Sequence, residues 1–278
     1  MGPLNALIDN TGGAFNTAIG RNTLFANTTG DSNTALGNQA LDFNTTGSDN
    51  LAAGSAALFD NTTGSQNTAI GQGALGANST ANANTAMGFE ALLKNTTGTQ
   101  NTASGWQALL NNTTGQFNTA TGAGALELNT TASDNTATGY QALLNNTTGN
   151  QNTGTGFDVL FSNTTGFGNT ADGAFALELN STGSNNTAFG DSALLSNTTA
   201  DDNTAVGSGP LTSTTIGAND TAIGALALQL NSTGTSNTAS GCSVNGTGEN
   251  GIGIAICAAM AMIALPAMTS RTWVIARR

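Results

Sequence analysis

The sequence predicts an all-β fold: a parallel β-solenoid of about 14 coils, followed by a short hydrophobic C-terminal tail. A 17-residue unit recurs along the chain, and one copy runs from Asn101 to Phe117 before Asn118 begins the next. A glycine at the fifth place recurs at this spacing without insertion or deletion from Gly20 to Gly241, and each copy up to the last carries a leucine at place 9. A period without drift indicates that every copy occupies the same structural slot, as in a solenoid.

The unit explains how one coil packs when its places are numbered 1 to 17 from the Asn of Asn-Thr-Ala-x-Gly, over residues 16–241. Place 3 is almost always Ala and place 8 is mostly Ala, so two walls of the coil can approach closely. Leu at place 9 supplies the main inward bulk, and we expect it to form a ladder through the core. The predicted core ladder includes Leu41, Leu58, Leu75, Leu92, Leu109, Leu126 and Leu143.

Each coil is expected to contain short strands separated by glycine corners. We assign a strand to places 1–4. Places 7–11 remain open, because Ala-Leu-Glu-Leu alternates like a strand whereas Gln-Ala-Leu-Leu is compatible with a helical turn. Glycine at places 5 and 15 permits the positive φ of a tight corner. Stacked coils align identical residues, so Asn and Thr are expected to form ladders.

The N-terminal segment, residues 1–15, does not fit the repeat well. It lacks the basic start and the apolar run of a signal peptide. Because the first coil of a solenoid has an open edge, we expect this segment to cap it.

The C-terminal segment, residues 242–278, differs in kind from the repeats. Residues 251–268 are 18 residues without a charge, followed by Arg271, Arg277 and Arg278. Their length is sufficient for a membrane anchor, and flanking arginines suit a cytoplasmic end. A hydrophobic cap over the last coil and an artefact of gene calling are the other interpretations.

The two cysteines of the chain, Cys242 and Cys257, both lie in this C-terminal segment. They could pair, but nothing in their spacing requires it, so we expect two free thiols.

Composition argues against catalysis and against nucleic-acid binding. The formal net charge is -11, and the only basic residues of the repeat body are Arg21 and Lys94. Such a surface repels phosphate backbones. Histidine is absent, which removes the commonest general base and metal ligand. Carboxylates are sparse and fall at varying places, so we predict no catalytic residues, no cofactor and no metal site.

The Asn at place 12 is followed by Thr or Ser two residues later and therefore forms a periodic glycosylation sequon. The alternative is that this Asn serves as a corner and ladder residue, since Asn also recurs at place 1, where no sequon exists. The candidate glycosylation sites are Asn27, Asn44, Asn61, Asn95, Asn112, Asn146 and Asn163.

Place 4 is the second candidate for apolar burial. Ordering each residue costs about 1–2 kcal/mol of backbone entropy, whereas one buried Leu returns only about 1.5–3 kcal/mol, so the core of a single coil is thin. Place 4 is apolar in Ile19, Leu36, Ile70, Met87, Phe189, Val206 and Ile223, and Ser, Thr or Asp in other copies. We expect it to be buried against another subunit; the alternative is that it is half exposed.

The repeat unit resembles repeats of tail-fibre-type and adhesin-like proteins. It is also similar to the head repeat of trimeric autotransporter adhesins, whose Ala-Ile-Gly-x-x-Ala core matches Ala18-Ile19-Gly20 and Ala69-Ile70-Gly71-Gln72-Gly73-Ala74. The resemblance covers about residues 16–241. It implies a trimer of left-handed β-rolls that projects from a surface and binds there.

These observations together predict a non-enzymatic structural or adhesive repeat protein. We expect an extracellular rod on a cell or virion, assembled as a homo-trimer or fibre and contacting a surface receptor or glycan. Membrane contact through residues 251–268 remains open. The alternative function is a ligand-binding solenoid whose Thr rows recognise ice or a polysaccharide surface. A degenerate enzyme scaffold is a third hypothesis.

Overall fold

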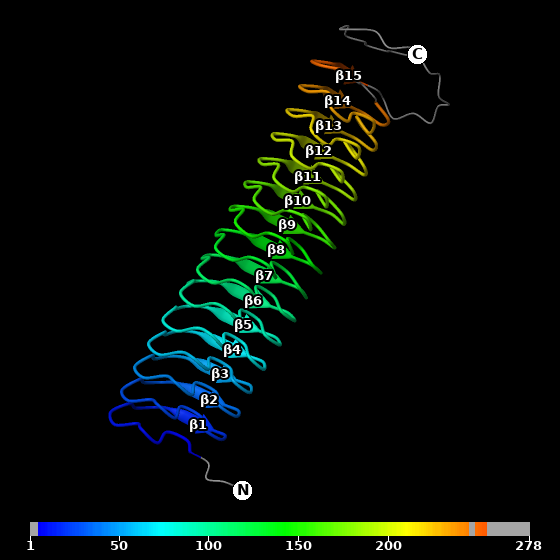
Figure 1. The fold of residues 1–278 in the computed structure, drawn as a ribbon. Coiled ribbons are helices and arrows are strands. Elements are labelled where there is room, and N and C mark those ends of the chain that lie inside the picture. The colour runs from blue at the N-terminus through cyan, green and yellow to red at the C-terminus, as the bar shows by residue number, and fades with distance from the viewer. Residues whose placement is uncertain (1–4, 245–247, 255–278) are drawn as a thin grey trace. The chain divides into compact units, whose positions relative to one another are not determined.

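The computed structural model describes residues 5–244 and 248–254, and shows a parallel β-solenoid of about 14 turns with 17-residue spacing (Figure 1). No helix occurs within these described ranges. The chain divides into two compact units, residues 1–150 and residues 151–278, and each is described by itself. The predicted all-β solenoid class is therefore confirmed.

Every coil contributes one strand of three residues, at places 2–4. The first unit contains β1 (Thr17–Ile19), β2 (Thr34–Leu36), β3 (Leu51–Ala53), β4 (Thr68–Ile70), β5 (Thr85–Met87), β6 (Thr102–Ser104), β7 (Thr119–Thr121) and β8 (Thr136–Thr138). The second unit contains β9 (Thr153–Thr155), β10 (Thr170–Asp172), β11 (Thr187–Phe189), β12 (Thr204–Val206), β13 (Thr221–Ile223), β14 (Thr238–Ser240) and β15 (Ile252–Ile254). Places 7–11, which the sequence left open between strand and helical turn, form neither; they are a succession of turns.

The strands pair in parallel, and each residue faces its equivalent one coil away. In β1 and β2, for example, Thr17 pairs with Thr34 and Ala18 with Ala35. The backbone also bonds from coil to coil outside the strands: the N–H of Leu109 donates to the carbonyl of Ala125 at 3.0 Å. Because each coil supplies partners to its neighbours all the way round, the thin side-chain core is supplemented by a continuous set of backbone hydrogen bonds.

The core consists of the predicted leucine ladder and the alanines at places 3 and 8. Leu41, Leu58, Leu75, Leu92, Leu109, Leu126 and Leu143 have no exposed surface. The same holds for the alanines of the coil that contains Leu109, Ala103 and Ala108. Small alanine walls and one branched residue per coil therefore fill the interior without a larger side chain.

The leucines adopt a backbone conformation that the sequence did not reveal. At place 9 their φ lies between 48° and 55° in all copies from Leu24 to Leu228. The left-handed region costs a non-glycine residue about 1–2 kcal/mol. Here it turns the side chain inward while the N–H still reaches the next coil. Places 7 and 17 show the same feature, as in Gln107 (52°) and Phe117 (58°).

The N-terminal segment continues the register of the repeat, although its sequence fits the pattern poorly. Leu7 occupies place 9, has a φ of 52° and donates its N–H to the carbonyl of Thr23 at 3.1 Å. Asn10 occupies place 12, and its Oδ1 accepts a hydrogen bond from Nδ2 of Asn27 at 2.8 Å. Residues 5–15, the described part of the expected cap, therefore form a partial coil that covers the coil containing β1.

The last described coil is three residues shorter than the others. Thr238 of β14 pairs with Ile252 of β15, a separation of 14 residues in place of 17. The missing residues fall between Val244, whose carbonyl bonds to Leu228, and Gly248, whose carbonyl accepts from Nδ2 of Asn237 at 2.8 Å. β15 lies within the segment that was assigned to the tail.

The structure bears on part of two expectations about the C-terminal segment, the free thiols and the membrane anchor. Cys242 is disulfide-bonded, so the expectation of two free thiols was wrong for this residue. The other cysteine, Cys257, lies outside the described residues. No helix in the described part of the chain is long and apolar enough to cross a membrane, and residues 255–268 of the candidate span lie outside that part.

Candidate functional site

The asparagines at place 12 form a buried ladder. Nδ2 of Asn112 donates to Oδ1 of Asn95 at 2.8 Å and to the carbonyl of Gly115 at 3.0 Å. Both amide hydrogens are therefore used, and the side chain has no exposed surface. Similar bonds recur from coil to coil in the first unit and again in the second. Buried polar groups are stabilising only when they are satisfied in this way.

Burial of this ladder bears directly on the candidate glycosylation sites. A glycan on Nδ2 would remove one ladder hydrogen bond and would need space that a fully buried side chain does not have. The packing is therefore incompatible with N-glycans at these places and favours the ladder interpretation. The side chains concerned, all with no exposed surface, are Asn27, Asn44, Asn61, Asn95, Asn112, Asn146 and Asn163.

A second asparagine ladder runs along place 1 and converges on the same carbonyls. The backbone N–H of Asn101 donates to Oδ1 of Asn84 at 2.9 Å, and Nδ2 of Asn101 donates to the carbonyl of Gly115 at 2.8 Å. The carbonyl of Gly115 thus accepts one amide from each ladder. These polar side chains hold the corners of the coil together and leave no free group for chemistry.

Both ladders change at one corner of the second unit, where Thr214 replaces the place-12 Asn of one coil and Asp220 replaces the place-1 Asn of the next. Asp220 is fully buried. Its Oδ1 accepts from the backbone N–H and Nδ2 of Asn237, at 2.8 and 3.0 Å, and its Oδ2 accepts from Nδ2 of Asn231 at 2.7 Å. Elsewhere in the ladder, Nδ2 of a place-12 Asn donates to Oδ1 of the place-12 Asn one coil earlier. Thr214 has no such amide oxygen, so Nδ2 of Asn231 donates to Asp220 instead.

This compensation is incomplete on the other side of the break. Thr214 donates its hydroxyl to the carbonyl of Asn231 at 2.8 Å, so it has no hydrogen left for the preceding rung. As a result Oδ1 of Asn197 is buried without a hydrogen-bond partner. An unsatisfied buried acceptor costs about 1–3 kcal/mol, which makes this coil a weak point in the second unit.

Burial raises the pKa of Asp220 above its ordinary value of 3.8, although the hydrogen bonds from Asn237 and Asn231 act in the opposite direction. A group with a raised folded pKa contributes stability that is fully present below the unfolded value and is lost as the pH rises through the folded value. Burial also raises the pKa of Asp42, Asp158 and Glu178, with the Asp158 charge adding to the effect at Glu178.

We therefore expect the melting temperature to rise as the pH is lowered toward the ordinary pKa values of these groups, 3.8 for Asp and 4.5 for Glu, because the folded state favours their protonated forms. Asp220→Asn should reduce this rise, because one of the four responsible carboxyl groups is then gone. Adding Thr214→Asn to Asp220→Asn restores both ladder residues and should raise stability above the single variant, since Asn197 regains a donor. Thermal melts followed by circular dichroism across this pH range test the expectation, and an unchanged slope in Asp220→Asn would contradict it.

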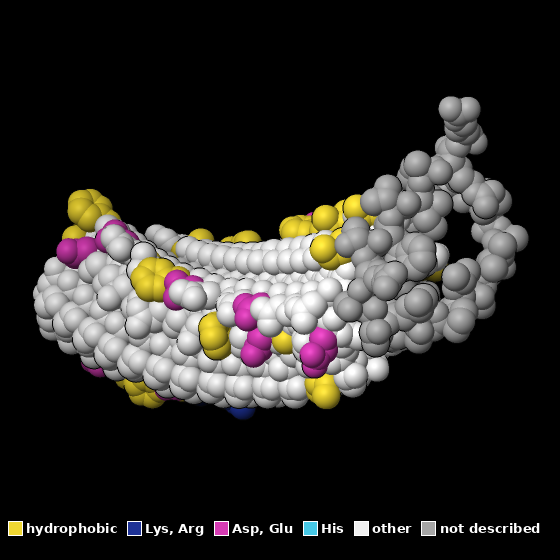
Figure 2. All heavy atoms as spheres, turned by 90° about the horizontal axis from the view of Figure 1, so that it is seen from above, with side chains coloured by type: hydrophobic (Ala, Val, Ile, Leu, Met, Phe, Trp, Pro, Cys, Tyr) yellow, Lys and Arg dark blue, Asp and Glu magenta, His cyan; other side chains and the backbone are white. Residues whose placement is uncertain are grey.

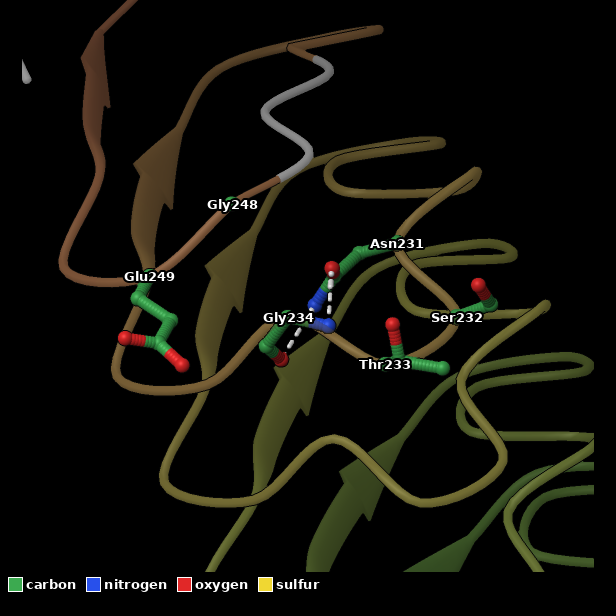
Figure 3. Close-up of a pocket in the computed structure, with 6 residues that line it drawn as sticks. All are labelled: Asn231, Ser232, Thr233, Gly234, Gly248 and Glu249. Carbon is green, nitrogen blue, oxygen red and sulfur yellow. Dashed lines mark hydrogen bonds between the residues drawn. The ribbon is translucent and has the colours of Figure 1, made fainter. Parts of the chain in front are cut away.

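A shallow hollow of about 350 Å³ lies between the end of the shortened coil and the coil before it, and it is lined by Asn231, Ser232, Thr233, Gly234, Gly248 and Glu249 (Figure 3). Asn231 points its amide toward Gly234, and two hydrogen bonds join these residues: Nδ2 of Asn231 donates to the Gly234 carbonyl at 3.0 Å, and the Gly234 N–H donates to Oδ1 of Asn231 at 3.1 Å. Glu249 supplies the only ionisable side chain of the hollow. One carboxylate without a base or second acid provides no catalytic pair.

The outer face of the strands carries place 2 and place 4. In the first unit place 4 presents Ile19 (61% exposed), Leu36 (50%), Ile70 (41%) and Met87 (42%). In the second unit Phe189, Val206 and Ile223 are exposed in the same way, on three consecutive strands. The sequence-predicted apolar row is therefore present on the surface of each unit.

Hydroxyl groups replace the apolar row over part of the first unit. Both outward places of three successive strands carry a hydroxyl there: Thr102 and Ser104, Thr119 and Thr121, Thr136 and Thr138. All except the half-buried Ser104 are exposed. The unbroken hydroxyl array in this unit is thus three coils long.

Charge on the described surface is mainly acidic. Figure 2 shows a face on which acidic side chains and separate hydrophobic patches interrupt a mostly polar surface, while basic side chains are scarce. No group of three or more His, Cys, Asp or Glu residues that could hold a metal occurs among the described residues. Asp158 and Glu178 are neighbours in the second unit, but they are a pair only.

Aromatic side chains at place 6 were not singled out from the sequence, although the repeat shows them. Phe89 (39% exposed), Trp106 (54%) and Tyr140 (49%) occupy this place in three of four successive coils of the first unit. Most other copies have a small or polar residue there, so the deviation is visible once the copies are aligned.

Comparison with protein-family models and with curated proteins gives no match to this chain.

Proposed function

We propose that this protein is a non-enzymatic structural and adhesive repeat protein that forms a surface-exposed rod, trimer or fibre on a cell or virion. The observation that carries the proposal is the exposed apolar row at place 4. A row of Ile, Leu and Met on a parallel strand face leaves apolar surface in water, and contiguous apolar patches of this kind commonly mark interfaces. A second and third copy of the chain, meeting through the same row, would bury it.

Two further features support an extracellular location and a structural role. Cys242 is disulfide-bonded, and disulfides persist mainly in oxidising compartments. The polar interior consists of asparagine ladders whose amides are used in holding coils together, which suits a rigid spacer. The repeat also resembles adhesin head repeats, for which projection and surface binding are expected.

The proposal predicts that the full-length protein has the mass of an oligomer, with a trimer expected, when measured by size-exclusion chromatography with light scattering. Ile70→Glu combined with Met87→Glu should shift the mass toward the monomer, because like charges would meet in the interface. Asp172 occupies place 4 in β10, so a carboxylate at this place is compatible with the coil.

The matched control is Gln72→Glu, which adds one negative charge to the coil of Ile70 at an exposed position outside place 4. It should leave the mass unchanged. A wild-type protein that is monomeric at micromolar concentration would refute assembly through place 4. So would a double variant that keeps the wild-type mass.

The hydroxyl array of β6, β7 and β8 favours a second candidate function, recognition of an ordered surface such as ice. Regularly spaced Thr hydroxyls can match an ordered array of water or sugar hydroxyls. Stacked coils produce regular Thr spacing in any case, and the array spans three coils in the first unit. Thermal hysteresis in dilute solution separates this candidate from the first, which predicts none.

A further inference from the structure

The aromatic row at place 6 forms a distinct feature of the first unit, which we name the aromatic strip: Phe89, Trp106 and Tyr140, with Ala123 between the last two. The backbone aligns it, because the N–H of Gln107 donates to the carbonyl of Phe89 and the N–H of Gly124 donates to that of Trp106, both at 2.9 Å. Coils repeat at about 4.8 Å. Trp106 and Tyr140 are thus about 9.6 Å apart along the stack, two coils at that spacing.

The coil between those of Trp106 and Tyr140 has small residues at places 6 and 7. Ala123 at place 6 has only a methyl group, and Gly124 at place 7 has no side chain. A Cβ at Gly124 would lie 3.3 Å from Cδ1 of Leu144 and 3.4 Å from both Cγ of Gln141 and Oε2 of Glu127. Gly124 itself is buried, so the coil between those of Trp106 and Tyr140 offers the methyl group of Ala123 with the Glu127 and Gln141 side chains nearby.

Polar groups follow the rings along the strip. Gln107 donates from Nε2 to Oε2 of Glu90 at 2.8 Å, which fixes an amide and a carboxylate beside Phe89 and Trp106. Gln141 follows Tyr140 directly. Amides both donate and accept hydrogen bonds, and carboxylates accept them from hydroxyl groups. The combination of flat apolar rings and neutral or acidic hydrogen-bonding groups is complementary to sugar rings, which present C–H faces and hydroxyl edges.

We propose that the aromatic strip binds a neutral polysaccharide chain, with sugar rings stacked on Trp106 and Tyr140 and hydroxyls bonded to Gln107, Glu127 and Gln141. The separation of the two rings is of the order of a disaccharide length, so every second sugar of an extended chain can stack. This inference rests on the proposed adhesive role and gives it a ligand class.

Charge and ring chemistry select this occupant over anionic ligands. No Lys or Arg lies in the strip or in the polar row beside it, and the chain carries a net charge of -11, so anionic glycans and phosphates would be repelled. Aromatic rings with polar edges, such as Trp and Tyr, suit a ligand that is apolar on one side and hydrated on the other.

The test measures retention of the full-length protein on insoluble cellulose and on chitin, with anionic alginate as the charged comparison. We expect retention on at least one of the two neutral glycans and none on alginate. Trp106→Ala and Tyr140→Ala should each weaken binding by about 3- to 10-fold, the range expected for one stacked ring, and the double variant should show no measurable retention. Ala123 already occupies place 6 in this unit, so alanine there is compatible with the coil.

Phe117→Ala is the matched control, because Phe117 is 51% exposed and lies at place 17, another corner of the coil. Ala83 holds the same place with the same φ of 58°. This variant should bind as the wild type does. Equal retention of the double variant and the wild type would overturn the inference, as would failure of the wild type to bind both neutral glycans.

The same samples separate this inference from the proposed assembly. If Trp106→Ala with Tyr140→Ala lowers the mass of the particle, the strip is a contact between copies and the glycan site is refuted. If the wild-type protein is an oligomer that binds neither glycan, assembly stands and only the ligand class fails.

Discussion

Replacing Leu109 with aspartate should unfold the coils around it. Leu109 has no exposed surface, and truncating such a leucine to alanine already costs about 2–5 kcal/mol. Aspartate adds a charge to a slot lined by alanine, and no Lys or Arg is buried in the described part of the chain. An isolated buried charge is far more costly than a lost contact. The expected result is a loss of more than about 5 kcal/mol in the unfolding free energy of these coils.

The matched control is Trp106→Asp, which introduces the same residue three positions earlier. Trp106 is 54% exposed, and Asp191 already occupies place 6 in another copy. This variant should melt within a few degrees of the wild type. Circular dichroism melts give the comparison, and hydrogen exchange locates the loss to the coils that contain Leu92, Leu109 and Leu126. Equal melting of the two variants would show that the inward face has been misassigned.

Much of the fold could be predicted because the information is carried by residue size and period. A leucine every 17 residues, with alanines at places 3 and 8, permits one arrangement in which identical residues stack. The repeat also predicted the strand position to within one residue: the expected strand begins at place 1, and β6 begins at Thr102, which is place 2. The exposed apolar row at place 4 follows from the same alternation, because place 3 points inward.

Backbone conformation was not predictable in the same way. Leu109, with a φ of 53°, adopts a region that residue type argues against. In this conformation the N–H of Leu109 donates to the carbonyl of Ala125 in the next coil and the side chain is fully buried. Leu7 adopts the same conformation in the N-terminal segment, where only a few residues match the repeat: Ala6, Leu7, Asn10, Thr11 and Gly13.

The candidate sites illustrate a different limit. The sequon at place 12 and the asparagine ladder use the same residues, so sequence alone could not separate them; burial of Asn112 does. The sequence does not explain why Thr214 and Asp220 replace two ladder asparagines. The structure does, because Nδ2 of Asn231 donates to Oδ2 of Asp220. Residues six positions apart in the chain compensate for each other across one corner.

The glycine at place 5 is the position where a single methyl group should do most harm to the backbone. In Gly71 the φ is +133°, a conformation that L-residues rarely adopt. A Cβ there would lie 2.7 Å from the carbonyl carbon of Gly88 in the next coil and still closer to its oxygen. The obstacle is backbone, so no side chain can rotate away, and the coil-to-coil hydrogen bonds on both sides would have to lengthen.

Gly71→Ala should therefore destabilise the first unit by at least about 3 kcal/mol, the sum of a strained φ and a broken coil contact. Gly73→Ala, two residues later, is the matched control. Its φ of +68° is shared by non-glycine residues at place 7, such as Ala56 at 55°, and its new Cβ would meet only side-chain atoms, at 3.5 Å or more. Urea unfolding of the two variants compares them directly. Gly71→Ala as stable as Gly73→Ala would mean that the coils are less closely stacked at this corner than the structure has them.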